Sequence, residues 1–136
     1  MIDIRSAVAT ATGELPGMLA VYLFGSFAEE REHRESDVDL GILLDRAVYP
    51  SERERFEFRV VAGSRLSDLF GRPADVVILN DAPPELARAI VKGKRLHCVD
   101  DEADHAFVRD AQLRAADIAP FLRRMRGIKL AAGERK

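Results

Sequence analysis

Apolar residues recur along the chain in two kinds of pattern, one spaced as in a helix and one nearly continuous. Near the start they return every three to four residues until Pro16-Gly17, which predicts a first helix over about 4–15. The next two apolar runs, at about 19–24 and 37–44, are short and bounded by turn residues, which favours strands. Helical and strand-like patterns then alternate without a linker. This alternation predicts an α/β fold of one domain, residues 1–136.

A capping signal marks the second helix. Ser51 and Glu54 have the spacing of a capping box, so a helix begins after Ser51, and Gly71 stops it. The apolar residues that lie roughly on one side of this helix are Phe56, Val60, Leu66 and Phe70. Three further elements are predicted: a strand over 75–79, a short helix between Asp81 and Gly93, and a short edge strand over 95–99.

The last helix is predicted over about 102–126, with one apolar stripe. Pro120 lies inside this segment and should kink or interrupt the helix. The tail 127–136 is basic and rich in small residues, so we expect it to fray. Leu122 and Met125 lie beyond the proline and have less reason to reach the core. They are therefore candidates for docking a partner.

Composition narrows the functional classes. The chain has 136 residues and a net charge of -2, so no basic field attracts nucleic acid, and we expect no direct nucleic-acid binding. The single cysteine, Cys98, excludes an internal disulfide and is interpreted as a core residue. No apolar run is long enough to cross a membrane and no signal-peptide pattern is present, so a cytoplasmic location is expected.

Two aspartates one residue apart stand at the start of the second strand. Asp37 and Asp39 share one face of that strand, with Val38 and Leu40 buried behind them. Neighbouring carboxylates repel each other unless a cation lies between them, and hard oxygen ligands suit Mg²⁺. Gly25-Ser26 ends the preceding strand, and a small turn of this kind lets backbone N–H groups approach a phosphate. Together these features predict a site for a metal ion and a nucleotide.

A third aspartate, Asp75, opens the strand predicted over 75–79. By itself it is typical of an aspartate that caps the turn after Pro73. Its place at the start of a strand also allows it to join Asp37 and Asp39, since three carboxylates on adjacent strands can hold two metal ions. On the residues alone, both interpretations stay open.

At this point the chain resembles a known family. Gly25-Ser26, ten further residues and Asp37-x-Asp39 are similar to the signature of the DNA polymerase β-like nucleotidyltransferases. Within that superfamily the chain most resembles the minimal nucleotidyltransferases (the MNT family), small single domains often encoded beside a HEPN toxin. The resemblance covers most of the chain and implies a polymerase β-like palm core. Such a core is an α+β fold, with a small mixed sheet backed by helices.

The resemblance also implies a chemistry. Asp75 matches the third carboxylate of the family by its gap to Asp39. Asp37, Asp39 and Asp75 would bind two Mg²⁺ ions, and Asp75 would act as the general base. ATP would be the substrate, and its AMP would pass to a tyrosine of a cognate HEPN toxin. The protein would then be an antitoxin that forms a hetero-oligomer with this toxin.

The loop after Gly25 departs from the usual pattern of the family. Ser26 would bind the β- or γ-phosphate, although a serine here is also typical of a simple turn. Many relatives carry Arg-Gly where this chain has Glu29-Glu30, and acidic residues near a triphosphate are unfavourable unless they face solvent. Arg31 and Arg34 are the candidates to supply the positive charge.

Two other functions stay open. One is a small-molecule nucleotidyltransferase of the aminoglycoside type, although such enzymes usually carry an additional helical domain that forms the acceptor pocket. The other is a non-catalytic antitoxin that neutralises its partner by contact alone. The three aspartates argue against the second alternative, and Glu29-Glu30 argues mildly for it.

Overall fold

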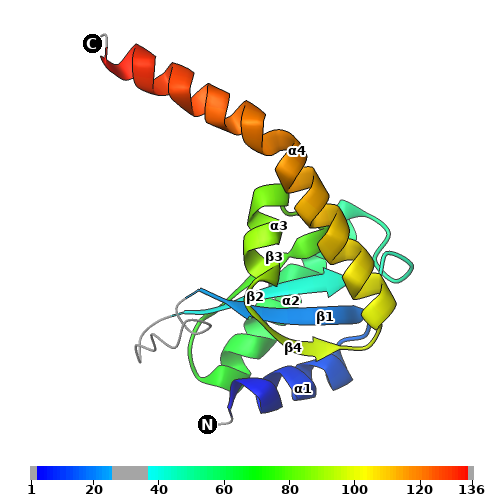
Figure 1. Ribbon diagram of the computed structural model, residues 1–136. Helices are drawn as coiled ribbons and strands as arrows, with labels where there is room; N and C mark the ends of the chain where they lie inside the picture. Colours follow the sequence, from blue (N-terminus) through cyan, green and yellow to red (C-terminus); the bar gives the residue numbers. More distant parts are fainter. Residues whose placement is uncertain (1–2, 26–36, 135–136) are drawn as a thin grey trace.

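A four-stranded sheet positions the rest of the chain. The computed structural model describes residues 3–25 and 37–134, except for the side chains of 118–123 and 126–134. The strands are β1 (Met18–Phe24), β2 (Val38–Leu44), β3 (Ala74–Ile78) and β4 (Lys94–Cys98). Their order across the sheet is β3-β2-β1-β4 (Figure 1). Since β1 is antiparallel to β2 and β4 while β2 and β3 are parallel, the sheet is mixed, as predicted.

Helices cover both faces of this sheet (Figure 1). On one face lie α1 (Ile4–Glu14) and α2 (Glu52–Phe70), and on the other lie α3 (Pro84–Val91) and the first part of α4 (Asp101–Glu134). A short 3-10 turn, η1 (Leu79–Asp81), joins β3 to α3. The predicted architecture, a small mixed sheet backed by helices, is confirmed.

The alternation of side chains along β2 separates two cores. Val38, Leu40 and Ile42 are fully buried against α1 and α2. The residues between them, Asp39 and Gly41, point to the face covered by α3. A Cβ at Gly41 would collide with Cγ2 of Ile90, so a glycine at this position lets α3 pack closely on β2. The prediction that apolar residues lie behind the aspartates is confirmed.

The second helix begins as predicted but turns a different side to the core. Oγ of Ser51 accepts a hydrogen bond from the Glu54 backbone N–H at 3.1 Å, which is the expected cap. Leu66 and Phe70 are buried, whereas Phe56 and Val60 are each 58% exposed. The buried apolar residues are spaced by four, at Phe58, Ala62, Leu66 and Phe70. Phe56 and Val60 stand two positions from this series, a rotation of about 200° around the helix. Their placement on the same side was wrong.

The last helix is longer than predicted. α4 continues through Pro120 to Glu134, whereas the sequence predicted an end near residue 126 and a frayed tail over 127–136. A proline removes one helical hydrogen bond and bends a helix, and it need not end it. Figure 1 shows α4 changing direction in its orange part, and the red part extends away from the sheet.

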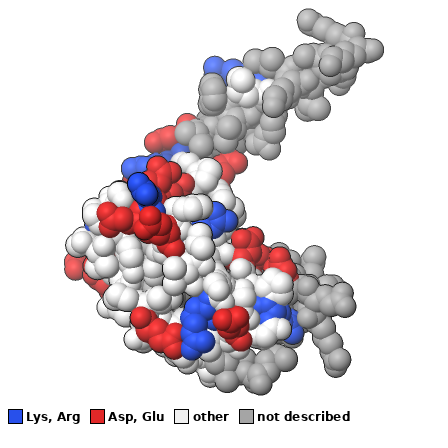
Figure 2. Space-filling model, turned by 180° about the vertical axis from the view of Figure 1, so that it is seen from behind, with Lys and Arg blue, Asp and Glu red and all other residues white. Residues whose placement is uncertain are grey.

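Charge and hydropathy of the described residues add two observations. Acidic and basic residues are intermixed on the face displayed in Figure 2, with no continuous basic surface among the residues coloured there. In the described part of the chain, no helix combines the length and the apolar character that crossing a membrane requires.

Candidate active site

The three aspartates lie at one end of the sheet, where β2 and β3 begin. In the register of the strands, Asp39 of β2 stands opposite Asp75 of β3 on one side and Phe24 of β1 on the other. Because β2 and β3 are parallel and paired residue for residue, the side chains of Asp39 and Asp75 share a face. Asp37 directly precedes β2 and has the same parity as Asp39. The fold therefore brings together the carboxylates that the sequence singled out.

The charges of Asp75 and Asp37 act on the Asp39 carboxyl. Partial burial raises the pKa of the Asp39 carboxyl, and the charges of Asp75 and then Asp37 raise this pKa further. Asp37 and Asp75 are exposed, and Asp39 is half buried. No hydrogen bond or ion pair joins any of the three carboxylates to another residue in the described part of the chain. The cluster is thus a local excess of negative charge.

Gly25 shapes the turn beside this cluster. Its φ of +76° lies in the left-handed region, which favours glycine. A Cβ on this residue would also collide with Oδ2 of Asp39. The chain therefore leaves β1 in close contact with a carboxylate of the site, which only a glycine permits without a shift. Ser26, Arg31 and Arg34 lie outside the described residues, so their roles in phosphate binding remain predictions.

The donor set fits a hard divalent cation. Mg²⁺ prefers oxygen ligands and usually binds one or two carboxylates together with substrate phosphates and water. Asp39 and Asp75 stand opposite each other and supply such oxygens, with Asp37 beside them. Within the described ranges, no three His, Cys, Asp or Glu side chains are close enough to hold a metal ion by themselves. Asp39 and Asp75 can thus supply only part of the ligand set of such a cation.

A buried carboxylate that the sequence did not single out holds α4 on the sheet. Asp104 is only 1% exposed and accepts a hydrogen bond from the Tyr22 hydroxyl at 2.7 Å and from Nη1 of Arg95 at 3.0 Å. Burial, and then the hydrogen bond to Asp104, raise the pKa of Tyr22. Asp104 also belongs to the acidic first turn of α4. A tyrosine inside an apolar strand was the available signal, since a buried hydroxyl needs a partner.

An ion pair between Arg55 and Asp81 stabilises the end of β3 that lies away from Asp75. Nε and Nη2 of Arg55 donate to the two carboxylate oxygens of Asp81 at 2.8 and 2.9 Å, and Nη1 donates to the Tyr49 carbonyl at 2.9 Å. Arg55 is 5% exposed, and its bond to Asp81 raises its pKa. This bidentate pair ties α2 to η1 and so fixes the position of β3, which carries Asp75.

Comparisons with known proteins agree with this geometry. The family described as "Polymerase beta, Nucleotidyltransferase" matches residues 9–102. The chain belongs to this nucleotidyltransferase family. The match runs from α1 through β4 and includes Gly25-Ser26, Asp37, Asp39 and Asp75. No curated protein sequence matches the chain.

Solved structures share the nucleotidyltransferase fold. A chain of a toxin-antitoxin complex with AMP-PNP has a TM-score of 0.68 at 20% identity, over 90% of this chain and 98% of that chain. A chain of the MntA-HepT toxin-antitoxin complex has a TM-score of 0.60 at 18% identity, over 89% and 95%. A chain from the tri-AMPylated Shewanella oneidensis HEPN toxin in complex with MNT antitoxin has a TM-score of 0.62 at 19% identity, over 89% and 94%. At these identities the likeness establishes a common fold.

Proposed function

We propose that this nucleotidyltransferase transfers AMP from ATP to a tyrosine hydroxyl of a HEPN-type toxin and so acts as an antitoxin. The in-register pair of Asp39 and Asp75 beside the Gly25 turn is the observation that carries the proposal. Two similar structures support the identity of the donor and the acceptor, since one contains AMP-PNP and another an AMPylated HEPN toxin. The acceptor is a protein in this proposal, so a hetero-oligomer with the toxin follows. We place the reaction in the cytoplasm, where ATP is available.

The aspartates have distinct roles in this proposal. Asp37, Asp39 and Asp75 hold two Mg²⁺ ions, which when bound would offset the phosphate charge and lower the pKa of the acceptor hydroxyl. Asp37 and Asp39 would mainly hold the Mg²⁺ ion that accompanies the nucleotide. Asp75 is the exposed carboxylate of the edge strand and accepts the proton of the acceptor hydroxyl. The hydroxyl oxygen then bonds to the α-phosphorus, the bond from this phosphorus to the bridging oxygen breaks, and pyrophosphate leaves.

The residues after Gly25 complete the nucleotide site in the same proposal. Ser26 binds the β- or γ-phosphate, and Arg31 and Arg34 supply positive charge that offsets Glu29-Glu30. The acidic pair lowers the affinity for the triphosphate unless it faces solvent.

Transfer of a label from ATP tests this function directly. The protein is incubated with Mg²⁺, ATP labelled at the α-phosphate and the product of the neighbouring gene, and modified residues are located by mass spectrometry. We expect AMP on a toxin tyrosine. Asp75→Asn should slow transfer by about 10²- to 10⁴-fold, as expected for loss of a general base. Asp68→Asn makes the same change at an exposed position of α2 and serves as the control.

The same experiment separates the two alternatives. Label on an added aminoglycoside, and none on the toxin, would assign a small-molecule transferase. Neutralisation of the toxin with no label on any acceptor would assign a non-catalytic antitoxin. Either result would refute the proposed function.

A further inference from the structure

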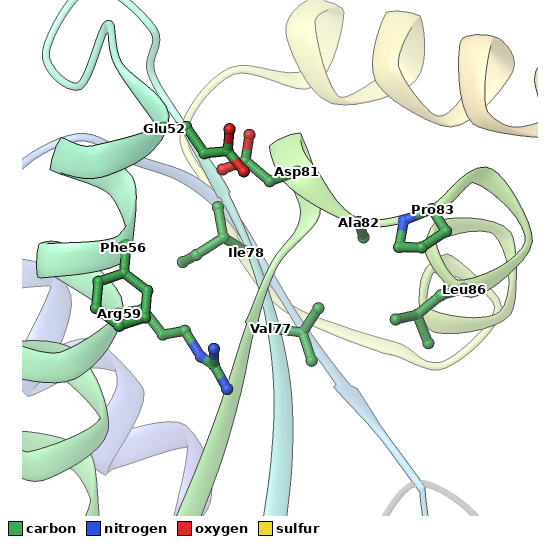
Figure 3. A pocket seen from close by; sticks show the side chains of 9 residues that line it. All are labelled: Glu52, Phe56, Arg59, Val77, Ile78, Asp81, Ala82, Pro83 and Leu86. Carbon is green, nitrogen blue, oxygen red and sulfur yellow. The ribbon is translucent and has the colours of Figure 1, made fainter.

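A groove follows the outer side of β3, and the part of it shown in Figure 3 lies between α2 and α3. It consists of two adjoining cavities of about 410 and 280 Å³, which share Phe56 and Arg59. The larger cavity is lined by Asp75 and Val60, and the smaller one by Leu86. In Figure 3, Phe56 and Arg59 come from α2, and Leu86 lies opposite them on α3. The groove therefore runs along the outer strand of the sheet, with Asp75 at one end and Leu86 at the other.

Large apolar side chains on the walls of this groove are exposed to solvent. Phe56 and Val60 are each 58% exposed, and Leu86 is 40% exposed. Phe56 and Val60 stand on the side of α2 that faces away from the buried series of this helix. Large apolar side chains that gather in a depression beside a reactive group are typical of a surface that binds a partner.

Side chains of α2 close the edge of β3 to another strand. Val38 N–H donates to the Pro73 carbonyl at 2.9 Å, so in this parallel pair the backbone groups of Ala74 and Val76 point away from β2. Nε of Arg59 donates to the Val76 carbonyl at 2.8 Å, and the Ala74 N–H donates to Oγ of Ser67 at 2.9 Å. A strand from a second copy would have to displace both bonds. The occupant of the groove therefore contacts side chains and does not extend the sheet.

We propose that this groove is the docking surface for the acceptor protein, which inserts apolar or aromatic side chains between Phe56, Val60 and Leu86. The inference rests on the proposed function. An acceptor hydroxyl has to reach Asp75, and Asp75 lines the groove that these apolar residues form. A polypeptide fits because exposed apolar side chains line both cavities, Phe56 and Val60 in the one with Asp75 and Phe56 and Leu86 in the other. The partner segment contacts Phe56 and Val60 while its tyrosine projects toward Asp75.

Binding without ATP tests this docking surface separately from chemistry. The double variant Phe56→Ser and Val60→Ser is compared with Val61→Ser, which lies on the same helix, is 55% exposed and does not line the groove. Calorimetry with the toxin should give a dissociation constant at least about 10-fold higher for the double variant, in the range of interface anchor residues. We expect Val61→Ser to stay within about 2-fold of the unchanged protein. The nucleotide affinity should be the same in all three proteins.

Three outcomes would overturn the proposal. The first is equal toxin affinity in the double variant and the unchanged protein. The second is weaker binding in Met125→Ser but not in the double variant, which would assign docking to α4. The third is loss of self-association in the double variant with toxin binding intact, which would assign the groove to a second copy. If the unchanged protein binds the toxin through Phe56 and Val60 but transfers no AMP, the proposed function fails and the docking surface is confirmed.

Discussion

Two carboxylates near β1, Asp104 of α4 and Asp39 of β2, differ in what surrounds them. Asp104 is almost fully buried, yet Tyr22 and Arg95 donate hydrogen bonds to it. Asp39 is more accessible, but its charged neighbours are Asp75 and Asp37, and burial and these two charges raise its pKa. The more deeply buried carboxylate is thus the one whose hydrogen-bond donors come from the protein itself.

Carboxylates that maintain the fold thus differ from those that we propose for the reaction. The bidentate pair of Arg55 and Asp81 resembles the Asp104 cluster, because each carboxylate has its donors supplied by the protein itself. Asp39 has like charges as neighbours instead, and in the proposed function a cation and a nucleotide would offset them. Like charges held together in this way are characteristic of functional sites.

The largest expected effect is on catalysis, and it is expected at Asp39, whose charged neighbours are also acidic. Asp39→Asn removes one charge and leaves the shape of the side chain nearly unchanged. If Asp39 holds the metal ions, AMP transfer should fall by about 10³-fold or more, which corresponds to about 4 kcal/mol of transition-state stabilisation. Single-turnover transfer of labelled AMP measures this loss. A rate within about 10-fold of the unchanged protein would contradict the role given to Asp39.

A smaller effect, on stability, is expected at Asp104, which has its hydrogen-bond donors within the protein. Asp104→Ala leaves the buried Tyr22 hydroxyl without its acceptor and removes the ion pair with Arg95. We expect the free energy of unfolding to fall by about 2–3 kcal/mol, as for a lost hydrogen bond to a buried charge. Asp101→Ala removes an exposed partner of the same Arg95 and should cost less than about 1 kcal/mol. Urea unfolding compares the two. Equal losses would show that burial of Asp104 adds nothing to its contribution.

The sequence predicted the sheet and the aspartate cluster because both depend on local pattern. Apolar runs fixed the strands, and the separation of Asp37 and Asp39 by one residue is enough to place them on one face. Asp75 needed the parallel register of β3 with β2, which its turn-like context left open. Phe56 and Val60 were assigned to the wrong side of α2 because apolar residues that serve a surface cannot be distinguished by periodicity from those that serve a core.

The contacts of Asp104 with Tyr22 and of Arg55 with Asp81 could not be predicted from the sequence, for a related reason. Asp104 meets Tyr22 across 82 positions of the chain, and Arg55 meets Asp81 across 26. An aspartate in a first helical turn and an arginine in a helix are each ordinary at the surface, and only the packing of distant elements buries them. The extension of α4 from residue 126 to Glu134 was missed because a basic segment of small residues near the end of a chain is also typical of a frayed tail.

Unfolding of the unchanged protein and Asp39→Asn, with and without Mg²⁺ and a non-hydrolysable ATP analogue, tests the central claim most directly. Because folding raises the pKa of Asp39, this group favours the folded state at low pH and loses that contribution as the pH rises through its folded pKa. At neutral pH and without ligand, Asp39→Asn should therefore be as stable as the unchanged protein or more stable. With both ligands at about 100 times their dissociation constant, the unchanged protein should gain about 3 kcal/mol and the variant far less. An equal gain in the two proteins would contradict the claim that Asp39 belongs to the metal-nucleotide site.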